Sequence, residues 1–228
     1  MKAPNARPHA AWGFRVAVVI VVVVALAVAG FGVWQLWGVG HQAAAKAGDA
    51  GDAYLASCPA DASSNGQPSP TLPAPLPPTS APPEGSIIGL LTLPGSLTTW
   101  PIKVGTGDDS LDAGVGWYPQ TASPGQIGNM AVVGRRLPSG GAFDSILSLS
   151  TGDQVVVETC TMRYTYTISV APRDLTVQPD ATWVLGAVPG QPSVVPTTSW
   201  LTLIANQDVL PSSDRAVGFA KLSDAVLR

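Results

Sequence analysis

Histidine and cysteine, the side chains best suited to act as base and nucleophile near neutral pH, are scarce in this sequence. The 228 residues include two histidines, His9 and His41, and two cysteines, Cys58 and Cys160. Beyond residue 58 the chain has one cysteine and no histidine. We therefore expect no Cys/His catalytic pair in the C-terminal part of the chain, because no imidazole is present there to accept a proton.

Other patterns that carry chemistry are absent or weak. No Cys/His cluster has the spacing of a zinc site, no Gly-x-x-x-x-Gly-Lys loop is present to bind phosphate, and no serine lies in a Gly-x-Ser-x-Gly elbow. Asp108, Asp109 and Asp112 form a small acidic group in a glycine-rich stretch. A calcium loop is one interpretation, but the twelve-residue EF-hand spacing is missing, which favours a helix-capping or turn-forming group. We predict no metal and no cofactor.

The N-terminal region has the character of a membrane span. Residues 16–40 contain no charged side chain and are mostly Val, Ala, Leu and Ile. As a helix this run would be about 37 Å long at ~1.5 Å per residue, enough to cross a hydrocarbon core of ~30 Å. We therefore predict a transmembrane helix over 16–40. The formal net charge of the chain is only −3, so nothing indicates a nucleic-acid partner.

The charges that flank this run predict its orientation. Residues 1–15 contain Lys and Arg but no Asp or Glu. The first charged residues after the run are Lys46, Asp49 and Asp52. The positive-inside rule then places 1–15 in the cytoplasm and the remainder outside the cell membrane. A cleavable signal peptide is the alternative, with a small-residue site at 43–45. The apolar run exceeds the usual signal core of ~7–15 residues, which favours an uncleaved signal anchor.

A linker is predicted over 41–83. Its first part, 41–57, is rich in alanine and is expected to extend the preceding helix briefly. Residues 59–83 are dominated by Pro, Ser, Thr and Ala, a composition that buries too little apolar surface to fold. Such a segment is typical of a semi-rigid spacer that reaches up to about 75 Å at ~3.1 Å per residue. A linker without a tuned length fits equally well.

Residues 84–228 are predicted to be one folded domain, mainly β. The apolar run 130–133, closed by Gly134, has the pattern of a buried strand. Residues 154–159 and 163–170 are predicted to form a hairpin, and several short strands with Gly/Pro turns indicate a barrel or sandwich. A helical turn is expected only near 142–149. The other predicted strands are 87–93, 100–104, 200–204 and 217–222.

Three segments and one arginine, in order and spacing, resemble a known family. Residues 116–125 read Gly-Trp-Tyr-Pro-Gln-Thr-Ala-Ser-Pro-Gly, residues 128–136 end in Arg135-Arg136, and residues 201–206 end in Asn206, with Arg215 nine positions later. This pattern is similar to that of sortases, and most of all to the actinobacterial class E and class F types. The resemblance implies an eight-stranded β-barrel. The membrane anchor and the spacer also match the layout of sortases of the cell envelope.

The resemblance also implies three active-site positions. Family members attack a sorting-signal peptide with a Cys thiolate, move protons with a His and stabilise the bound carbonyl or oxyanion with an Arg. In this chain the Cys position holds Asn206, the His position holds Arg135, and only the Arg is retained, as Arg215. An amide nitrogen is not a comparable nucleophile and a guanidinium does not accept a proton. We therefore interpret the chain as a catalytically inactive pseudoenzyme.

Three functions remain open on the sequence. In the first, Arg135, Asn206 and Arg215 line a groove that binds a sorting-signal peptide or a cell-wall component, with Asp208 or Asp214 as an internal partner of the arginines. A remnant site without a ligand is the simpler version of this interpretation. In the second, the domain pairs with an active sortase or another envelope protein. In the third, the chain is a transpeptidase with a non-standard nucleophile such as Ser199, Ser212 or Ser213.

The two cysteines allow two arrangements. In an exported protein Cys58 and Cys160 can form a disulfide, which would attach the linker to the barrel. Two thiols that do not pair with each other are equally compatible with the sequence, because a proline-rich segment sets no distance between them.

Overall fold

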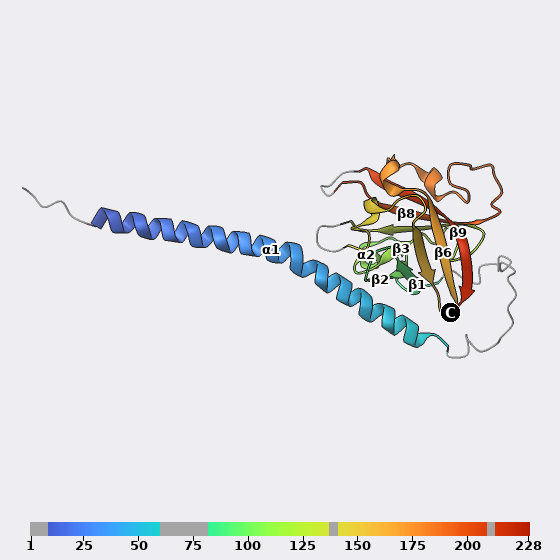
Figure 1. The fold of residues 1–228 in the computed structure, drawn as a ribbon, viewed down its shortest axis with the longest axis horizontal. Coiled ribbons are helices and arrows are strands. Elements are labelled where there is room, and N and C mark those ends of the chain that lie inside the picture. The colour runs from blue at the N-terminus through green and yellow to red at the C-terminus, as the bar shows by residue number, and fades with distance from the viewer. Residues whose placement is uncertain (1–8, 60–81, 137–140, 209–212) are drawn as a thin grey trace, which may run out of the picture.

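The computed structural model describes residues 9–59, 82–136, 141–208 and 213–228, without the side chains of 9–14, 16 and 33–41. The first eight residues of the predicted cytoplasmic segment and most of the proline-rich linker, 60–81, lie outside this range. The described residues form one long helix, α1 (His9–Ser57), and a β domain with a short helix, α2 (Asp108–Leu111). Figure 1 shows α1 extending far from the β domain, with its C-terminal part beside it.

The strands form a closed barrel. Eight strands are hydrogen-bonded in the order β6-β5-β1-β2-β3-β4-β8-β9, and β6 also pairs with β9, which closes the sheet. A two-residue strand, β7, pairs only with β9. The predicted barrel is thus confirmed. The bounds are β1 (Ile87–Thr92), β2 (Thr99–Val104), β3 (Val115–Trp117), β4 (Gly128–Gly134), β5 (Gln154–Glu158), β6 (Met162–Val170), β7 (Thr176–Val177), β8 (Ser199–Asn206) and β9 (Arg215–Leu227).

Alternating apolar side chains fill the barrel. Leu91, Ile102, Val132, Tyr166 and Leu203 come from five strands and are all fully buried in one core cluster. Burial of such side chains stabilises the fold by about 1.5–3 kcal/mol each. The β5–β6 hairpin forms as predicted. The connections that the structure describes contain three 3₁₀ helices: η2 (Ile146–Ser148), which falls in the predicted helical turn, η3 (Pro172–Asp174) and η4 (Thr182–Leu185).

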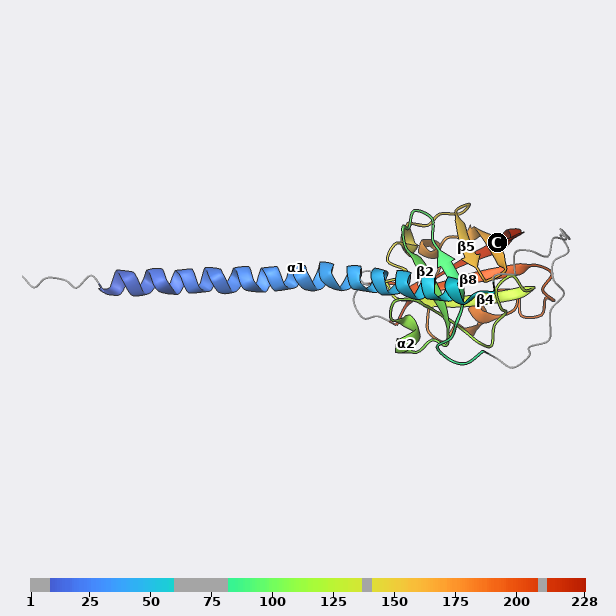
Figure 2. The same cartoon turned by 90° about the horizontal axis from the view of Figure 1, so that it is seen from below.

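The C-terminal part of α1 packs on the outside of β1 and β2. Ala47 is fully buried there, Ala44 is partly buried, and Gly51 lies against Leu90. Small side chains on one helix face let the helix backbone approach the sheet closely. Residues 41–57, which we assigned to the linker, belong to α1. Because they pack on the barrel, the folded domain includes residues that precede the predicted boundary at Glu84. Figure 2 shows this part of α1 lying along the barrel.

The predicted membrane span, 16–40, is part of α1. Within the described residues, no helix combines the length and the hydropathy needed to cross a membrane.

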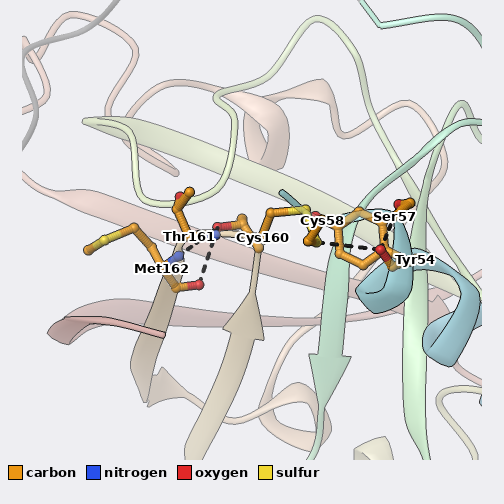
Figure 3. Close-up of a disulfide and its surroundings, with 7 residues drawn as sticks. Tyr54, Ser57, Cys58, Cys160, Thr161 and Met162 are labelled. Atoms are coloured by element: carbon orange, nitrogen blue, oxygen red, sulfur yellow. Dashed lines mark hydrogen bonds between the residues drawn. A yellow bond between two sulfur atoms is a disulfide. The ribbon is translucent and has the colours of Figure 1, made fainter. Parts of the chain in front are cut away.

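A disulfide joins Cys58, directly after α1, to Cys160 in the β5–β6 turn. Their Cα atoms are 5.2 Å apart, and 102 residues separate them along the chain. Figure 3 shows the bond between the end of α1 and the hairpin, with Tyr54 beside it. Both cysteines of the chain are therefore oxidised, and of the two arrangements left open above the structure has the paired one.

We expect Gly134→Ala to lower the free energy of unfolding by about 1–3 kcal/mol, through overpacking. A Cβ at residue 134 would lie 2.6 Å from ring atoms of Phe143, which is fully buried. Chemical denaturation of the purified chain measures the effect. In the control, Gly107→Ala, the new Cβ meets no atom within 4 Å, and the change should stay below about 1 kcal/mol. Equal losses in the two variants would contradict the packing argument.

Candidate functional site

The predicted site positions lie at the same end of three neighbouring strands. β4 ends at Gly134, β8 ends at Asn206, and β9 begins at Arg215. The parallel register pairs Val133 with Ile204, and the antiparallel register pairs Asn206 with Arg215. Arg135 follows β4 directly, so the sheet brings all three positions to one edge. We call this the site end of the barrel.

Arg135 is paired with an aspartate that the sequence analysis did not assign to it. Its Nη2 atom lies 2.5 Å from Oδ1 of Asp108 in the first turn of α2. Asp108 is 94% exposed and Arg135 is 31% exposed, so solvent screens the pair, which contributes at most about 1 kcal/mol. The carboxylate partner of Arg135 is thus Asp108, rather than Asp208 or Asp214. Asp108 and Asp109 lie in the first turn of α2, whereas Asp112 directly follows its last residue.

Arg215 is oriented by the turn that precedes it. Its Nη1 atom donates to the backbone carbonyls of Ser213, at 2.9 Å, and Asp214, at 3.2 Å. The carboxylate of Asp214 instead accepts a hydrogen bond from Gln178 at 2.8 Å. Two backbone carbonyl oxygens therefore help to hold the guanidinium in place.

Two residues at the site end escaped the sequence analysis. Arg136 donates to the backbone carbonyl of Gln207, which ties the end of β4 to the residue after β8. The side-chain Oε1 of Gln207 is buried and accepts no hydrogen bond from the described residues. A buried acceptor without a donor costs about 1–3 kcal/mol, so this oxygen lowers the stability of the site end.

A cavity of about 270 Å³ lies beside Arg215, between η4, β7 and the outer face of β8 and β9. Apolar side chains form most of its wall, with Tyr118 and Arg215 among the polar ones. Burial raises the pKa of the Tyr118 hydroxyl, and the positive charge of Arg215 opposes this effect. Tyr118 is therefore a neutral donor at physiological pH. The apolar lining residues are Val177, Val184, Leu185, Ile204 and Val217.

A buried polar group holds η4 over the sheet and so shapes the cavity. The amide nitrogen of Asn129 donates to the carbonyls of Val184, at 2.9 Å, and Gly186, at 3.0 Å. Its amide oxygen accepts from the hydroxyl of Thr202 at 2.7 Å. Asn129 and Thr202 are both buried, on β4 and β8. The sequence analysis noted these two residues only as parts of a motif, because their partner in η4 lies about 55 residues away from Asn129.

The serines considered as alternative nucleophiles are not gathered at the site. Ser199 is buried at the start of β8, seven residues from Asn206, and its hydroxyl lies 3.2 Å from that of Tyr166. A strand of that length separates them by about 23 Å. Ser212 lies outside the described residues. Ser213 is exposed, with its hydroxyl 3.5 Å from the Asp214 carboxylate, and is the one described candidate at the site end.

Neither a thiol nor a metal site is found at the site end. Cys160 follows β5 at the opposite end of the barrel, since β5 runs away from the site end, and its sulfur is bonded to Cys58. Among the described residues, no group of three or more His, Cys, Asp or Glu side chains is placed to hold a metal ion.

Comparisons with known proteins assign the fold. A family model described as a sortase domain matches residues 91–223. The solved structure of SrtA sortase from Actinomyces oris is 30% identical over 65% of this chain and 89% of its own, with a TM-score of 0.59. Sortase E1 from Streptomyces coelicolor, with a tripeptide in the active site, is 29% identical over 63% and 92%, with a TM-score of 0.57.

A third solved structure is similar in fold alone. SrtF sortase from Corynebacterium diphtheriae is 22% identical over 68% of this chain and 92% of its own, with a TM-score of 0.60. Among curated protein sequences, no match was found. The matches thus include structures of the E and F types.

We expect Asn129→Ala to destabilise the chain by about 2–4 kcal/mol, because it leaves two carbonyls and the Thr202 hydroxyl without their partner in a buried place. Thermal or chemical denaturation measures the loss. Gln154→Ala, on an exposed position of β5, is the matched control and should change stability by less than about 0.5 kcal/mol. A loss no larger than that of the control would show that η4 is held by other contacts.

Proposed function

The chain belongs to the sortase family, and from that premise we propose that it is a membrane-anchored, catalytically inactive member that binds a peptide at the site end of the barrel. The observation that carries the proposal is the trio at the strand ends. By the resemblance of the sequence motifs, Asn206 and Arg135 correspond to the family's nucleophile and base and Arg215 to its arginine; in the structure these residues lie at one end of the barrel, and a cavity lies beside Arg215.

The lack of activity follows from the chemistry of the groups present. An acyl-enzyme route needs a nucleophile and a group that accepts its proton. Asn206 supplies neither, and Arg135 stays protonated and is paired with Asp108. Both cysteines are in a disulfide at the other end of the barrel, and no histidine follows residue 41. If only the nucleophile or only the base were lost, a neighbouring side chain could replace it. The loss of both removes the acyl-enzyme route.

A peptide ligand is supported by the groups that remain. Arg215 can donate to a peptide carbonyl or carboxylate, and Tyr118 can donate a further hydrogen bond. The apolar wall of the cavity suits a small aliphatic side chain. The tripeptide in the active site of the sortase E1 relative supports the same class of ligand.

Membrane anchoring is the second part of the proposal. Large apolar side chains between Val18 and Phe31 are exposed on α1, on all sides of the helix. A helix that is apolar all round is typical of a membrane span. Together with the uncharged run 16–40 and the basic residues before it, this supports a single span with the barrel outside the cytoplasm. An accessory role beside an active sortase in the same membrane is consistent with this arrangement.

An enzyme with a displaced nucleophile is the alternative function. Ser213 is its candidate, with the Asp214 carboxylate as the nearest group that can accept a proton. That carboxylate already accepts a hydrogen bond from Gln178, so it is not oriented toward Ser213 alone.

We expect the purified chain to bind a sorting-signal peptide without cleaving it. Arg215→Ala should weaken binding by about tenfold to hundredfold, the effect of losing a hydrogen bond to a charged group. Calorimetry measures the affinity, and chromatography with an added amine acceptor measures cleavage and transfer. Arg163→Ala, an exposed arginine paired with Glu158 far from the site end, is the control and should bind normally.

A double variant, Arg135→His with Asn206→Cys, tests the site independently of binding. If the rest of the site still has the geometry of an active sortase, this variant should cleave a sorting-signal peptide that the natural chain does not cleave. Peptide cleavage by the natural chain that Ser213→Ala abolishes would overturn the assignment as inactive. Failure of all peptides to bind, or binding unchanged by Arg215→Ala, would overturn the binding role.

We expect the full chain to stay in the membrane fraction after alkaline extraction. Val22→Arg combined with Ala25→Arg should release it, because each arginine costs about 2.5–3.5 kcal/mol near the centre of a span. Ala45→Arg, an exposed position near the barrel, should leave the chain in the membrane. Release of the natural chain, or an intact mass that lacks the first ~45 residues as for a cleaved signal peptide, would contradict the anchor.

A further inference from the structure

Residues 44–58, the docked segment, attach α1 to the barrel in two ways. Ala44, Ala47 and Gly51 pack on β1 and β2, and Cys58 is bonded to Cys160. The proline-rich residues that follow therefore cannot set the distance between α1 and the barrel, because the helix that precedes them is already attached to it.

The docked segment has a direction relative to the candidate site. Lys46, near its start, lies 4.0 Å from Asp112, directly after α2, and α2 also supplies the Asp108 partner of Arg135. Cys58, at its end, is bonded to the β5–β6 turn at the opposite end of the barrel. Both Figure 1 and Figure 2 show α2 on the side of the barrel that faces the N-terminal half of α1. The site end thus faces the apolar half of the helix.

The packing of the docked segment is sparse. A cleft of about 320 Å³ lies between the helix and the β1–β2 turn, lined in part by Gly48, Gly51 and Leu97. The Lys46–Asp112 pair is two-thirds exposed on both sides, so it contributes little. Ala44, Ala47 and Gly51 bury little apolar area, and the half-buried Tyr54 lies beside the disulfide itself, where it is hydrogen-bonded to the backbone of Cys160. The disulfide is therefore the main constraint that keeps the segment in place.

We propose that the Cys58–Cys160 bond holds the barrel with its site end toward the membrane, and that reduction of this bond by a dithiol releases the barrel from α1. The orientation relative to the membrane rests on the proposed anchor, whereas the attachment of α1 to the barrel does not. About six residues, or ~9 Å of helix, separate the predicted span from Lys46, so the oxidised chain presents its site close to the bilayer.

Reduction proceeds by two thiol–disulfide exchanges. One thiolate of the dithiol attacks a sulfur of the bond and forms a mixed disulfide, and the cysteine that leaves takes up a proton. The second thiolate then displaces the other cysteine. Two electrons and two protons pass to the protein, which gains two thiols, and the dithiol becomes a cyclic disulfide. Cys58 and Cys160 are both partly exposed, which gives the reductant access.

Hydrogen exchange tests the attachment without a membrane. In the oxidised full chain, amides of residues 44–57 should exchange slowly, and a dithiol or the variant Cys58→Ser with Cys160→Ser should accelerate them by about tenfold or more. Ala47→Glu places a charge on the buried face and should accelerate exchange as well. Ala45→Glu, on the exposed face, is the matched control and should not. Strands β4 and β8 should keep their protection in every variant that has folded.

Energy transfer to labelled lipids tests the orientation. In nanodiscs, a fluorescent amino acid at the exposed Asp109, in α2 beside the site end, should transfer more energy than one at Leu227, at the end of β9. A dithiol should reduce that difference. If a thiol count confirms that the bond is reduced but hydrogen exchange of residues 44–57 is unchanged, the proposed release is overturned. If both labelled positions transfer equal energy to the lipids, the proposed orientation is overturned. If the chain does not insert into nanodiscs but hydrogen exchange gives the expected results, only the proposed membrane anchor is overturned.

Discussion

Two ladders on either side of β8 determine where every group of the candidate site lies. The parallel ladder with β4 and the antiparallel ladder with β9 bring Arg135, Asn206 and Arg215 to one edge of the barrel. A slip of one residue would turn each of these side chains to the other face of the sheet. The buried Asn129–Thr202 hydrogen bond crosses the same β4–β8 pair and opposes such a slip. The register, the cover formed by η4 and the cavity beside Arg215 therefore depend on one another.

This interdependence is compatible with the proposed loss of the reactive groups, because the shape of the site does not depend on them. Position 206 ends a strand and is half-buried, so an amide fits there without disturbing the core. Arg135 extends outward to Asp108 in solvent, so the larger side chain needs no space inside the barrel. The shape of the cavity beside Arg215 comes from Asn129, Thr202 and the apolar lining residues, none of which would take part in a reaction. Binding and reaction are thus separable properties of this fold, and substitution at two surface positions changes only the second.

The parts of the structure that the sequence predicted are those with a local signal. Alternating apolar residues and Gly/Pro turns predicted the strands, and the ordered motifs predicted the barrel and the placing of the trio. Features that join distant segments had no such signal. The Asp108 partner of Arg135 and the link from Asn129 to η4 depend on approach in space across tens of residues. Packing of residues 44–51 was missed for another reason: alanine and glycine carry little hydrophobic signal, although they suit close contact between a helix and a sheet.

Because of the disulfide, the proline-rich segment does not act as a spacer between α1 and the barrel. A tether gives a domain reach, but it also lets the domain rotate and spreads its site over a large volume, which lowers the effective concentration for a ligand fixed in the same membrane. A helix that packs on the barrel and is bonded to it at Cys58 removes that freedom, and the orientation it imposes follows from the direction of α1. The proposed binding role gains more from such placement than catalysis would, because occupancy is its only output. Attachment of the helix and the proposed lack of activity are therefore compatible parts of one arrangement.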